Sequence, residues 1–168
     1  MKLCYLDFDG VLHPEAVYWN PNKGAFLCED LVEAGHRLFE HARLLEELLA
    51  PHSDVRIVLS TSWVLQYRFA GAAKRLPPAL RERCIGGTFH SREMNRYDFQ
   101  AMQRGAQVLS DVARRRPEAW LAIDDTNEGW GTTASANLVL SHPHLGIAHP
   151  DVLPLLQRRL AEQFSLPK

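Results

Sequence analysis

The sequence predicts an α/β protein with a Rossmann-like parallel β-sheet sandwiched by helices. Apolar runs typical of strands alternate along the chain with amphipathic helical patterns, which is the order that builds a parallel sheet. Several of these runs are continuously apolar, as expected for strands that helices cover on both faces. Residues 13–29 interrupt the alternation, and their two prolines and one glycine predict a small flap or minimal cap, either a loop or a hairpin.

Five segments carry strand patterns and four carry helix patterns. The strands are expected at residues 2–7, 55–60, 84–89, 120–124 and 136–141, and the third of these has the weakest pattern. The helices are expected at residues 30–50, 63–76, 98–116 and 150–164. The helix over 30–50 has the clearest apolar face and is expected to end before Pro51, because a proline cannot continue a helix.

The composition is that of an ordinary globular domain. The 168 residues are 46% hydrophobic and 23% charged, a balance that supports one domain over residues 1–168 with a core that needs no disulfides. No stretch approaches the roughly 20 apolar residues of a membrane helix, and no leader pattern precedes the first strand. The three cysteines are widely spaced, which indicates reduced thiols. We therefore expect a cytoplasmic protein with no membrane partner, and the oligomeric state stays open.

The charges are distributed unevenly along the chain. Residues 66–116 hold 11 Lys and Arg against 4 Asp and Glu, a net charge of +7, whereas the remainder holds 8 against 16, a net charge of −8. An acidic first part beside a basic middle segment suits a metal site next to an anion site. The alternative is that the arginine-rich helices are simply solvated.

Acidic and hydroxyl residues follow three of the expected strands. Asp7 and Asp9 follow the first strand, residues 60–62 (Ser-Thr-Ser) follow the second, and Asp124 and Asp125 end the fourth. Because the carboxyl ends of parallel strands meet at one edge of a sheet, we expect these side chains to converge there. Carboxylates in such proximity repel each other and need a cation or a proton. Oxygen ligands alone favour Mg²⁺.

The three peptides that carry these residues resemble a known superfamily. "YLDFDGVLHP", "IVLSTSW" and "WLAIDDT" are similar to motifs of the haloacid dehalogenase-like (HAD) hydrolases, which are mostly Mg²⁺-dependent phosphatases. The resemblance runs from residue 3 to about residue 141. The forms "LDFDGVLHP" and "LSTSW" further resemble the branch of HAD domains associated with RNA-repair proteins. The resemblance implies a phosphatase that hydrolyses phosphomonoesters through an aspartyl-phosphate intermediate.

The resemblance assigns roles to the residues of the first motif. Asp7 matches the nucleophile and a Mg²⁺ ligand. Asp9 matches the general acid and base, and its backbone carbonyl matches a further Mg²⁺ ligand. Gly10 gives the chain room to turn away beside the bound substrate.

The later motifs supply the other expected ligands. Thr61 matches the hydroxyl that holds a phosphoryl oxygen; Ser62 also borders the substrate, and both Ser60 and Ser62 remain alternatives for the hydroxyl role. Asp124 and Asp125 match the acidic fourth motif. We expect Asp125 to be the direct Mg²⁺ ligand and Asp124 to be the supporting one.

The superfamily also requires a cation that stabilises the nucleophile and the phosphoryl group. We assign this role to Arg104, because its predicted helix precedes the strand that ends in the two aspartates. Lys74 and Arg96 remain alternatives. At least two of these three side chains must be ordinary surface charges.

The expected cap is too short to enclose a substrate. An open site with basic flanks is compatible with a nucleotide, a nucleic-acid end or a phosphoprotein. Trp19, Trp63 and Trp130 are candidates for stacking on a base, but Trp63 is expected in the core instead. His13 follows the first motif closely enough to face the substrate. The competing functions are a receiver-like signalling domain that keeps its phosphate, a Mg²⁺ nuclease, and a catalytically silent binding protein of the same fold. A receiver carries its adjacent acids after the first strand, whereas here they come late in the chain.

Overall fold

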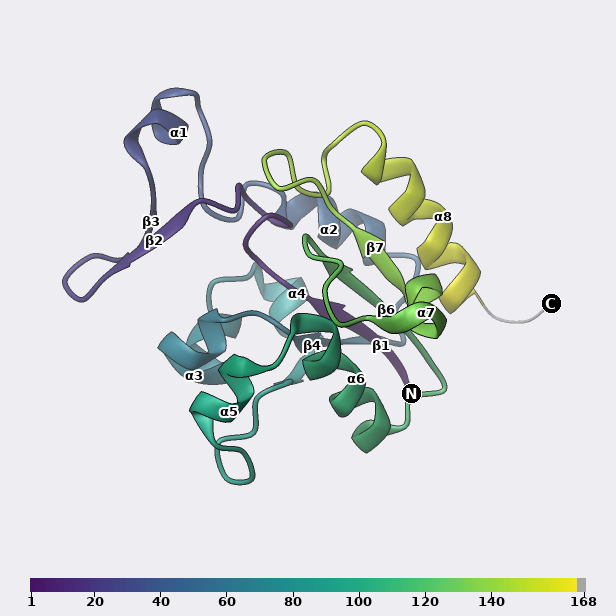
Figure 1. Cartoon of the computed structure of the whole chain (residues 1–168). Coiled ribbons are helices and arrows are strands. Elements are labelled where there is room, and N and C mark those ends of the chain that lie inside the picture. The colour runs from purple at the N-terminus through teal and green to yellow at the C-terminus, as the bar shows by residue number, and fades with distance from the viewer. Residues whose placement is uncertain (166–168) are drawn as a thin grey trace.

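A five-stranded parallel β-sheet forms the centre of the molecule (Figure 1). The computed structural model describes residues 1–165, with side chains for all of these except 133–135, so residues 166–168 of the expected domain lie outside the described residues. The strands lie in the order β5-β4-β1-β6-β7. Their bounds are β1 Lys2–Leu6, β4 Val55–Leu59, β5 Cys84–Gly87, β6 Ala119–Asp124 and β7 Leu138–Leu140. The predicted α/β class is confirmed, and each predicted strand is present.

β1 is the central strand, and all five of its residues are buried. The apolar run from Leu3 to Leu6 fits this place, because helices cover both faces of the sheet. In the parallel register, Leu6 lies opposite both Leu59 of β4 and Ile123 of β6. The segments that follow these three strands therefore begin at one edge of the sheet, where the predicted site residues lie.

Helices cover both faces of this sheet. Their bounds are α1 Glu29–Glu33, α2 Ala42–Leu49, α3 Trp63–Ala73, α4 Pro78–Arg81, α5 Arg96–Ala101, α6 Arg104–Arg115, α7 Gly131–Ala134 and α8 Val152–Phe164. α2 and α8 lie over one face and α6 over the other (Figure 1). Accordingly, Cys4 and Leu6 of β1 join a core cluster with α2 and α8, whereas Leu3 and Tyr5 join a second cluster on the α6 side. None of the helices described is both long and apolar enough to cross a membrane.

The predicted helix over residues 30–50 is wrong, because the structure has two helices there. α1 ends at Glu33 and α2 begins at Ala42. Between them Gly35 and Phe39 adopt positive φ angles of 94° and 60°, which no α-helix contains. The Phe39 ring packs edge-on against Phe8 and other rings under the site, at a centroid distance of 5.1 Å from Phe8. Packing of Phe39 thus outweighs the helical periodicity of the sequence.

The predicted helix over residues 98–116 is also divided. α5 ends before Met102, whose backbone is extended, and α6 begins at Arg104. Gly105, in the first turn of α6, packs so closely on the backbone of Gly129 that any side chain at position 105 would overlap it. The break therefore lets the start of α6 approach the loop after β6, and this places Arg104 at the site.

The second predicted helix, over residues 63–76, is confirmed in position but is kinked. Arg68 has a φ of 58°, so α3 contains two helical pieces that meet at this residue. A further short helix, α4, follows Pro77 and was not predicted. The fourth predicted helix, over 150–164, corresponds to α8.

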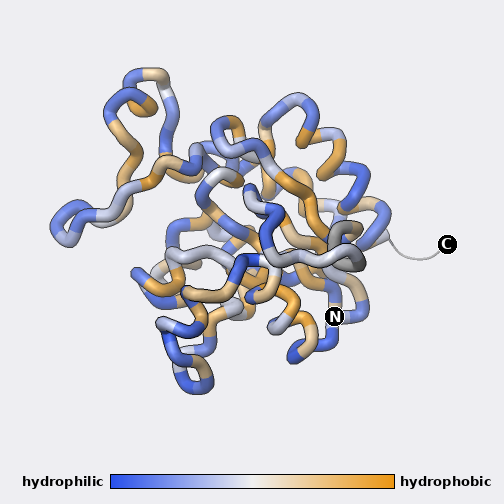
Figure 2. The backbone as a smooth tube through the Cα atoms, in the orientation of Figure 1, coloured by the Kyte–Doolittle hydropathy of each residue, from blue (hydrophilic) through white to orange (hydrophobic). Residues whose placement is uncertain are grey.

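The flap expected over residues 13–29 is a β-hairpin. β2 (Val17–Asn20) pairs antiparallel with β3 (Gly24–Leu27), and the hairpin projects from the body of the molecule together with α1 (Figure 1). Figure 2 shows that the tip of the hairpin is hydrophilic, whereas the hydrophobic segments gather in the central sheet. The hairpin is tied to α3 by one hydrogen bond, in which the Ala25 amide donates to the Tyr67 hydroxyl over 2.7 Å.

Candidate functional site

Three carboxylates meet at the carboxyl edge of the sheet. Asp7 follows β1 directly, Asp124 is the last residue of the neighbouring β6, and Asp125 follows it. Each side chain offers one oxygen, and these three oxygens lie within 4.8 Å of one another. Asp7 is 4% exposed and Asp124 is fully buried. The register of β1 and β6 therefore brings together the three acids that the sequence places at separate positions.

Arg104 is the cation that faces this cluster. Its guanidinium lies 3.7 Å from an oxygen of Asp7 and 3.4 Å from an oxygen of Asp124, and it also donates to the backbone carbonyl of Ser60. Lys74 and Arg96 are exposed, and within the described part of the chain neither forms an ion pair with these carboxylates. The geometry thus favours Arg104 among the three predicted candidates.

One arginine does not neutralise three acids, of which Asp7 and Asp124 are buried and Asp125 is half-buried. Burial, followed by repulsion from Asp7, raises the pKa of Asp124 to about 8 and that of Asp125 to about 7. Burial also raises the pKa of Asp7, although Arg104 opposes this shift. For Arg104 itself burial alone would lower the pKa, but the attraction of Asp7 and Asp124 outweighs it and the pKa is raised. The cluster holds more negative charge than its surroundings stabilise.

The chemistry of the cluster fits a divalent cation. Its donors are carboxylate oxygens, which are the ligands that Mg²⁺ prefers. The buried Oδ2 atom of Asp124 accepts no hydrogen bond from the residues described, so it is available as a ligand. A cation among these oxygens would offset the repulsion that raises their pKa values. The side chain of Asp9 lies outside the group of three, and its predicted contribution was through its backbone carbonyl.

Two buried side chains donate hydrogen bonds to one oxygen of Asp9. Its Oδ1 atom accepts hydrogen bonds from Trp63 Nε1 at 2.8 Å and from His13 Nε2 at 2.9 Å. The backbone amide of Phe39 donates to His13 Nδ1 over 3.0 Å, so that nitrogen carries no proton and Nε2 is the donor to Asp9. The two donors fix Asp9 Oδ1 and leave Oδ2 for a reacting group.

Sequence reasoning missed both of these contacts. It placed His13 toward the substrate, whereas His13 is buried and hydrogen-bonds Asp9. The core position expected for Trp63 is confirmed, but its hydrogen bond to Asp9 was not foreseen. The sequence does contain the two residues at informative positions: His13 is four residues after Asp9, and Trp63 directly follows the hydroxyl run. Recognising it required the turn that folds residue 13 back onto residue 9.

Gly10 makes that turn possible. Its φ angle is 70°, and a Cβ at this position would overlap the carboxylate of Asp125. The Gly10 amide donates to the carbonyl of His13 at 2.9 Å, and its own carbonyl accepts from the Ser141 hydroxyl at 2.6 Å. Gly10 thus lets the loop pass directly beside the carboxylates, as the prediction of a turn required.

The hydroxyl run after β4 divides into three environments. Thr61 is buried, and its hydroxyl hydrogen-bonds Asp7, which opposes the rise that burial causes in the pKa of that carboxylate. The side chain of Ser60 is buried without a hydrogen bond among the described residues, and Ser62 is exposed at the start of α3. Thr61 is therefore the hydroxyl beside the predicted nucleophile, and Ser62 faces the open side.

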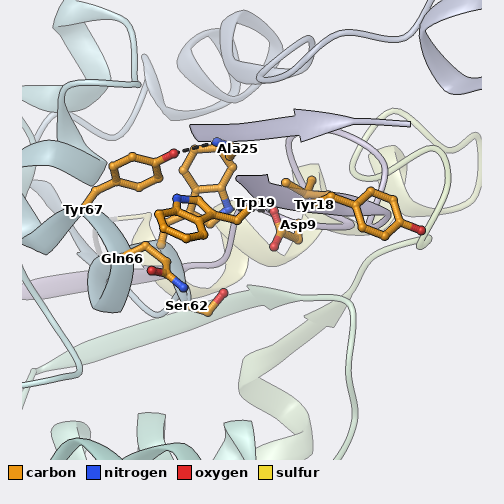
Figure 3. Close-up of a pocket in the computed structure, with 9 residues that line it drawn as sticks. Asp9, Tyr18, Trp19, Ala25, Ser62, Gln66 and Tyr67 are labelled. Atoms are coloured by element: carbon orange, nitrogen blue, oxygen red, sulfur yellow. Dashed lines mark hydrogen bonds between the residues drawn. The ribbon is translucent and has the colours of Figure 1, made fainter. Parts of the chain in front are cut away.

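Two hollows open beside the site and share Ser62. The first lies between the hairpin and α3; Asp9 borders it and it contains Trp19, Gln66 and Tyr67 (Figure 3). The second lies on the α5 and α6 side and is bordered by Arg104. A substrate whose phosphate reaches the carboxylates thus has open space on both sides of Ser62.

The comparisons with known proteins agree with this arrangement. A family model described as the HAD domain in Swiss Army Knife RNA repair proteins matches residues 3–152. No curated protein and no solved structure shows significant similarity to the chain. The matched region contains β1, β4 and β6 with all of the carboxylates described above. The chain therefore belongs to the HAD superfamily, in the family of HAD domains of Swiss Army Knife RNA repair proteins.

Proposed function

We propose that the protein is a Mg²⁺-dependent phosphatase that hydrolyses phosphomonoesters of a nucleotide or of a nucleic-acid end through an aspartyl-phosphate. The observation that carries this proposal is that Asp7 and Asp9 lie in two different environments, each suited to a different role in the reaction. Asp7 is buried between Arg104 and the acidic pair, where an anionic phosphoryl group meets a cation. Asp9 is partly exposed, is fixed through one oxygen, and borders the hollow in which a leaving group has room.

In the first step, a carboxylate oxygen of Asp7 attacks phosphorus. A bond between that oxygen and phosphorus forms, the bond from phosphorus to the leaving oxygen breaks, and protonated Asp9 gives its proton to the leaving oxygen. Arg104 stabilises the negative charge that the phosphoryl oxygens carry during transfer. Mg²⁺ held by Asp7, Asp125 and the carbonyl of Asp9, with Asp124 in support, would offset the repulsion between the nucleophile and the phosphate.

In the second step, water hydrolyses the aspartyl-phosphate. Asp9, now unprotonated, takes a proton from the water, whose oxygen bonds to phosphorus while the bond from phosphorus to Asp7 breaks. Inorganic phosphate leaves and Asp9 is again protonated. The hydrogen bonds from His13 and Trp63 hold Asp9 at one place for both transfers.

The proposal is tested by turnover of aryl phosphates, nucleotides and 5′- or 3′-phosphorylated oligonucleotides with and without chelator. We expect hydrolysis that requires Mg²⁺, and an Asp7→Asn variant that keeps its fold but loses several orders of magnitude in kcat, because the amide is not a nucleophile. Circular dichroism of Asp7→Asn supplies the control for folding. Hydrolysis that persists in excess chelator would contradict the metal assignment.

The same experiment separates the competing functions. A stable acyl phosphate without turnover would identify a receiver-like domain, and cleavage of internal phosphodiesters would identify a nuclease. A protein that binds phosphorylated ligands but neither hydrolyses them nor becomes labelled would be the silent relative. An Asp9 side chain fixed beside Asp7 supports turnover over the receiver-like and the silent alternatives, and the choice of substrate distinguishes the phosphatase from the nuclease.

A further inference from the structure

We infer that the hollow between the hairpin and α3 is a base-binding subsite, which receives the nucleobase of a phosphorylated nucleoside and stacks it on Trp19. The inference rests on the phosphatase activity proposed above and names the part of the substrate that the protein selects. Asp9, the residue that protonates the leaving oxygen, borders this hollow. The group attached to that oxygen therefore extends into it.

The hairpin presents Trp19 to the hollow by its strand geometry. Successive residues of a strand point to opposite faces, so Trp19 and its cross-strand partner Ala25 share one face, and Tyr18 and Phe26 share the other. Trp19 is 48% exposed even though it borders the hollow. In Figure 3 the Trp19 indole lies among Tyr67, Gln66 and Ser62, whereas the ring of Tyr18 points away from them. An exposed indole at a substrate opening is a stacking surface that the fold leaves uncovered.

The opposite wall is aromatic, and both of its rings are held by further contacts. Trp63 and Tyr67 lie one turn apart on α3, with ring centroids 5.5 Å apart. The guanidinium of Arg75, just after the end of α3, lies 4.4 Å from the Tyr67 ring centroid. Tyr67 also accepts the hydrogen bond from the Ala25 amide, so the same side chain lines the hollow and fixes the position of the hairpin. The space between Trp19 and this wall is thus defined before a ligand binds.

The polar groups of the hollow favour a nucleobase over the phenyl ring of a phosphotyrosine. Gln66 offers an amide donor and acceptor, and Ser62 offers a hydroxyl, both exposed at the edge of the aromatic walls. The edges of a base present ring nitrogens and exocyclic groups that match such partners, whereas a phenyl ring leaves them unmatched. Stacking with a few edge contacts is the usual way in which proteins hold an unpaired base.

The test compares substrates and one pair of matched variants. We expect kcat/KM for nucleoside monophosphates to exceed that for β-glycerophosphate, which has a phosphate but no ring, and for phosphotyrosine. In Trp19→Ala the ratio of kcat/KM for nucleotide over β-glycerophosphate should fall about tenfold, the usual loss when one stacking ring is removed. Trp19→Phe should restore part of the ratio. Phe26→Ala, which removes an exposed ring from the opposite face of the same hairpin, should keep it.

A binding measurement separates this inference from the proposed function. Calorimetry with adenosine monophosphate should show weaker binding to Trp19→Ala than to the wild type or to Phe26→Ala, whether or not hydrolysis occurs. Absence of hydrolysis of every monoester would overturn the phosphatase, and this binding difference would then still decide the subsite. Equal binding by all three proteins, or a preference for phosphotyrosine over nucleotides, would overturn the subsite. Comparison of mononucleotides with phosphorylated oligonucleotides shows whether the base belongs to a free nucleotide or to a nucleic-acid end.

Discussion

Arg104 determines the charge balance at the centre of the site. It lies within 4 Å of both Asp7 and Asp124, and its side chain is only 19% exposed. A cation this close to two anions in a partly buried place contributes more than a surface ion pair does, because less water screens it. Its position at the first residue of α6 depends on the break before that helix. The cation role therefore follows from packing as much as from charge.

If the proposed phosphatase mechanism holds, Arg104→Ala should lower kcat by about a hundredfold or more, because the phosphoryl oxygens would lose their charge partner during transfer. Steady-state kinetics under saturating Mg²⁺ measure this loss. Arg104→Lys should recover part of the rate, since it restores the charge but not the planar set of donors. Lys74→Ala and Arg96→Ala are the matched controls on exposed positions. A collapse of the rate in either control, with Arg104→Ala unaffected, would transfer the assignment to that residue.

At the same scale, the sequence predicted the residues that lie at strand ends. Asp7, Asp124 and Asp125 were predictable because parallel strands end at one edge of a sheet, whatever the details of the loops. The contacts of His13 and Trp63 with Asp9 were not, because they depend on a positive φ at Gly10 and on a ring that is both core and hydrogen-bond donor. Local pattern does not encode such turns.

At the scale of elements, all five strands of the central sheet were predictable, but the breaks that divide two of the predicted helices were not. Apolar periodicity continues through residues 34–41 and 102–103, where the chain leaves the helix. In both places a close contact decides the outcome: the Phe39 ring packs beneath the site, and Gly105 lies against the loop after β6. Apolar periodicity indicates which face of a helix is buried but not where the helix ends. The positions of these two breaks are therefore determined by tertiary contacts.

The hairpin depends on its hydrogen bond to α3. The bond joins the Ala25 amide to the Tyr67 hydroxyl, and Tyr67→Phe removes only that hydroxyl. We expect faster hydrogen exchange at the Ala25 amide, with little change in the strands of the central sheet, because only a local opening becomes easier. Exchange measured by NMR tests this, and the amides of β1 are the internal control. Unchanged exchange at Ala25 would show that other contacts hold the hairpin.

For the whole molecule, we expect the acidic cluster to couple folding to pH and, through the proposed cation, to Mg²⁺. Asp124 and Asp125 have pKa values raised from 3.8 to about 8 and about 7, so the native protein keeps protons that the unfolded chain has already released. Their contribution to stability is complete below about pH 4 and is lost progressively as the pH rises to about 8. The lowered pKa of Asp111 has the opposite effect: its contribution to stability is lost as the pH falls into the acid range. Burial also lowers the pKa values of His41 and His52. Their neutral forms favour the native state, so this contribution too is lost as the pH falls below about 6.

A comparison with Asp125→Asn removes the effect of these other groups, since they are the same in both proteins. In chelator we expect the melting temperature of the wild type to fall, relative to that of the variant, by roughly 5–10 °C between pH 5.5 and pH 8. Mg²⁺ should raise the wild-type melting temperature more at pH 8 than at pH 5.5, because at the lower pH protons compete for the same oxygens. Differential scanning calorimetry at both pH values measures each effect. Two outcomes would contradict this view: melting temperatures that change equally with pH in both proteins, or a Mg²⁺ effect that does not depend on pH. Either would show that the three carboxylates do not repel one another at a shared cation site.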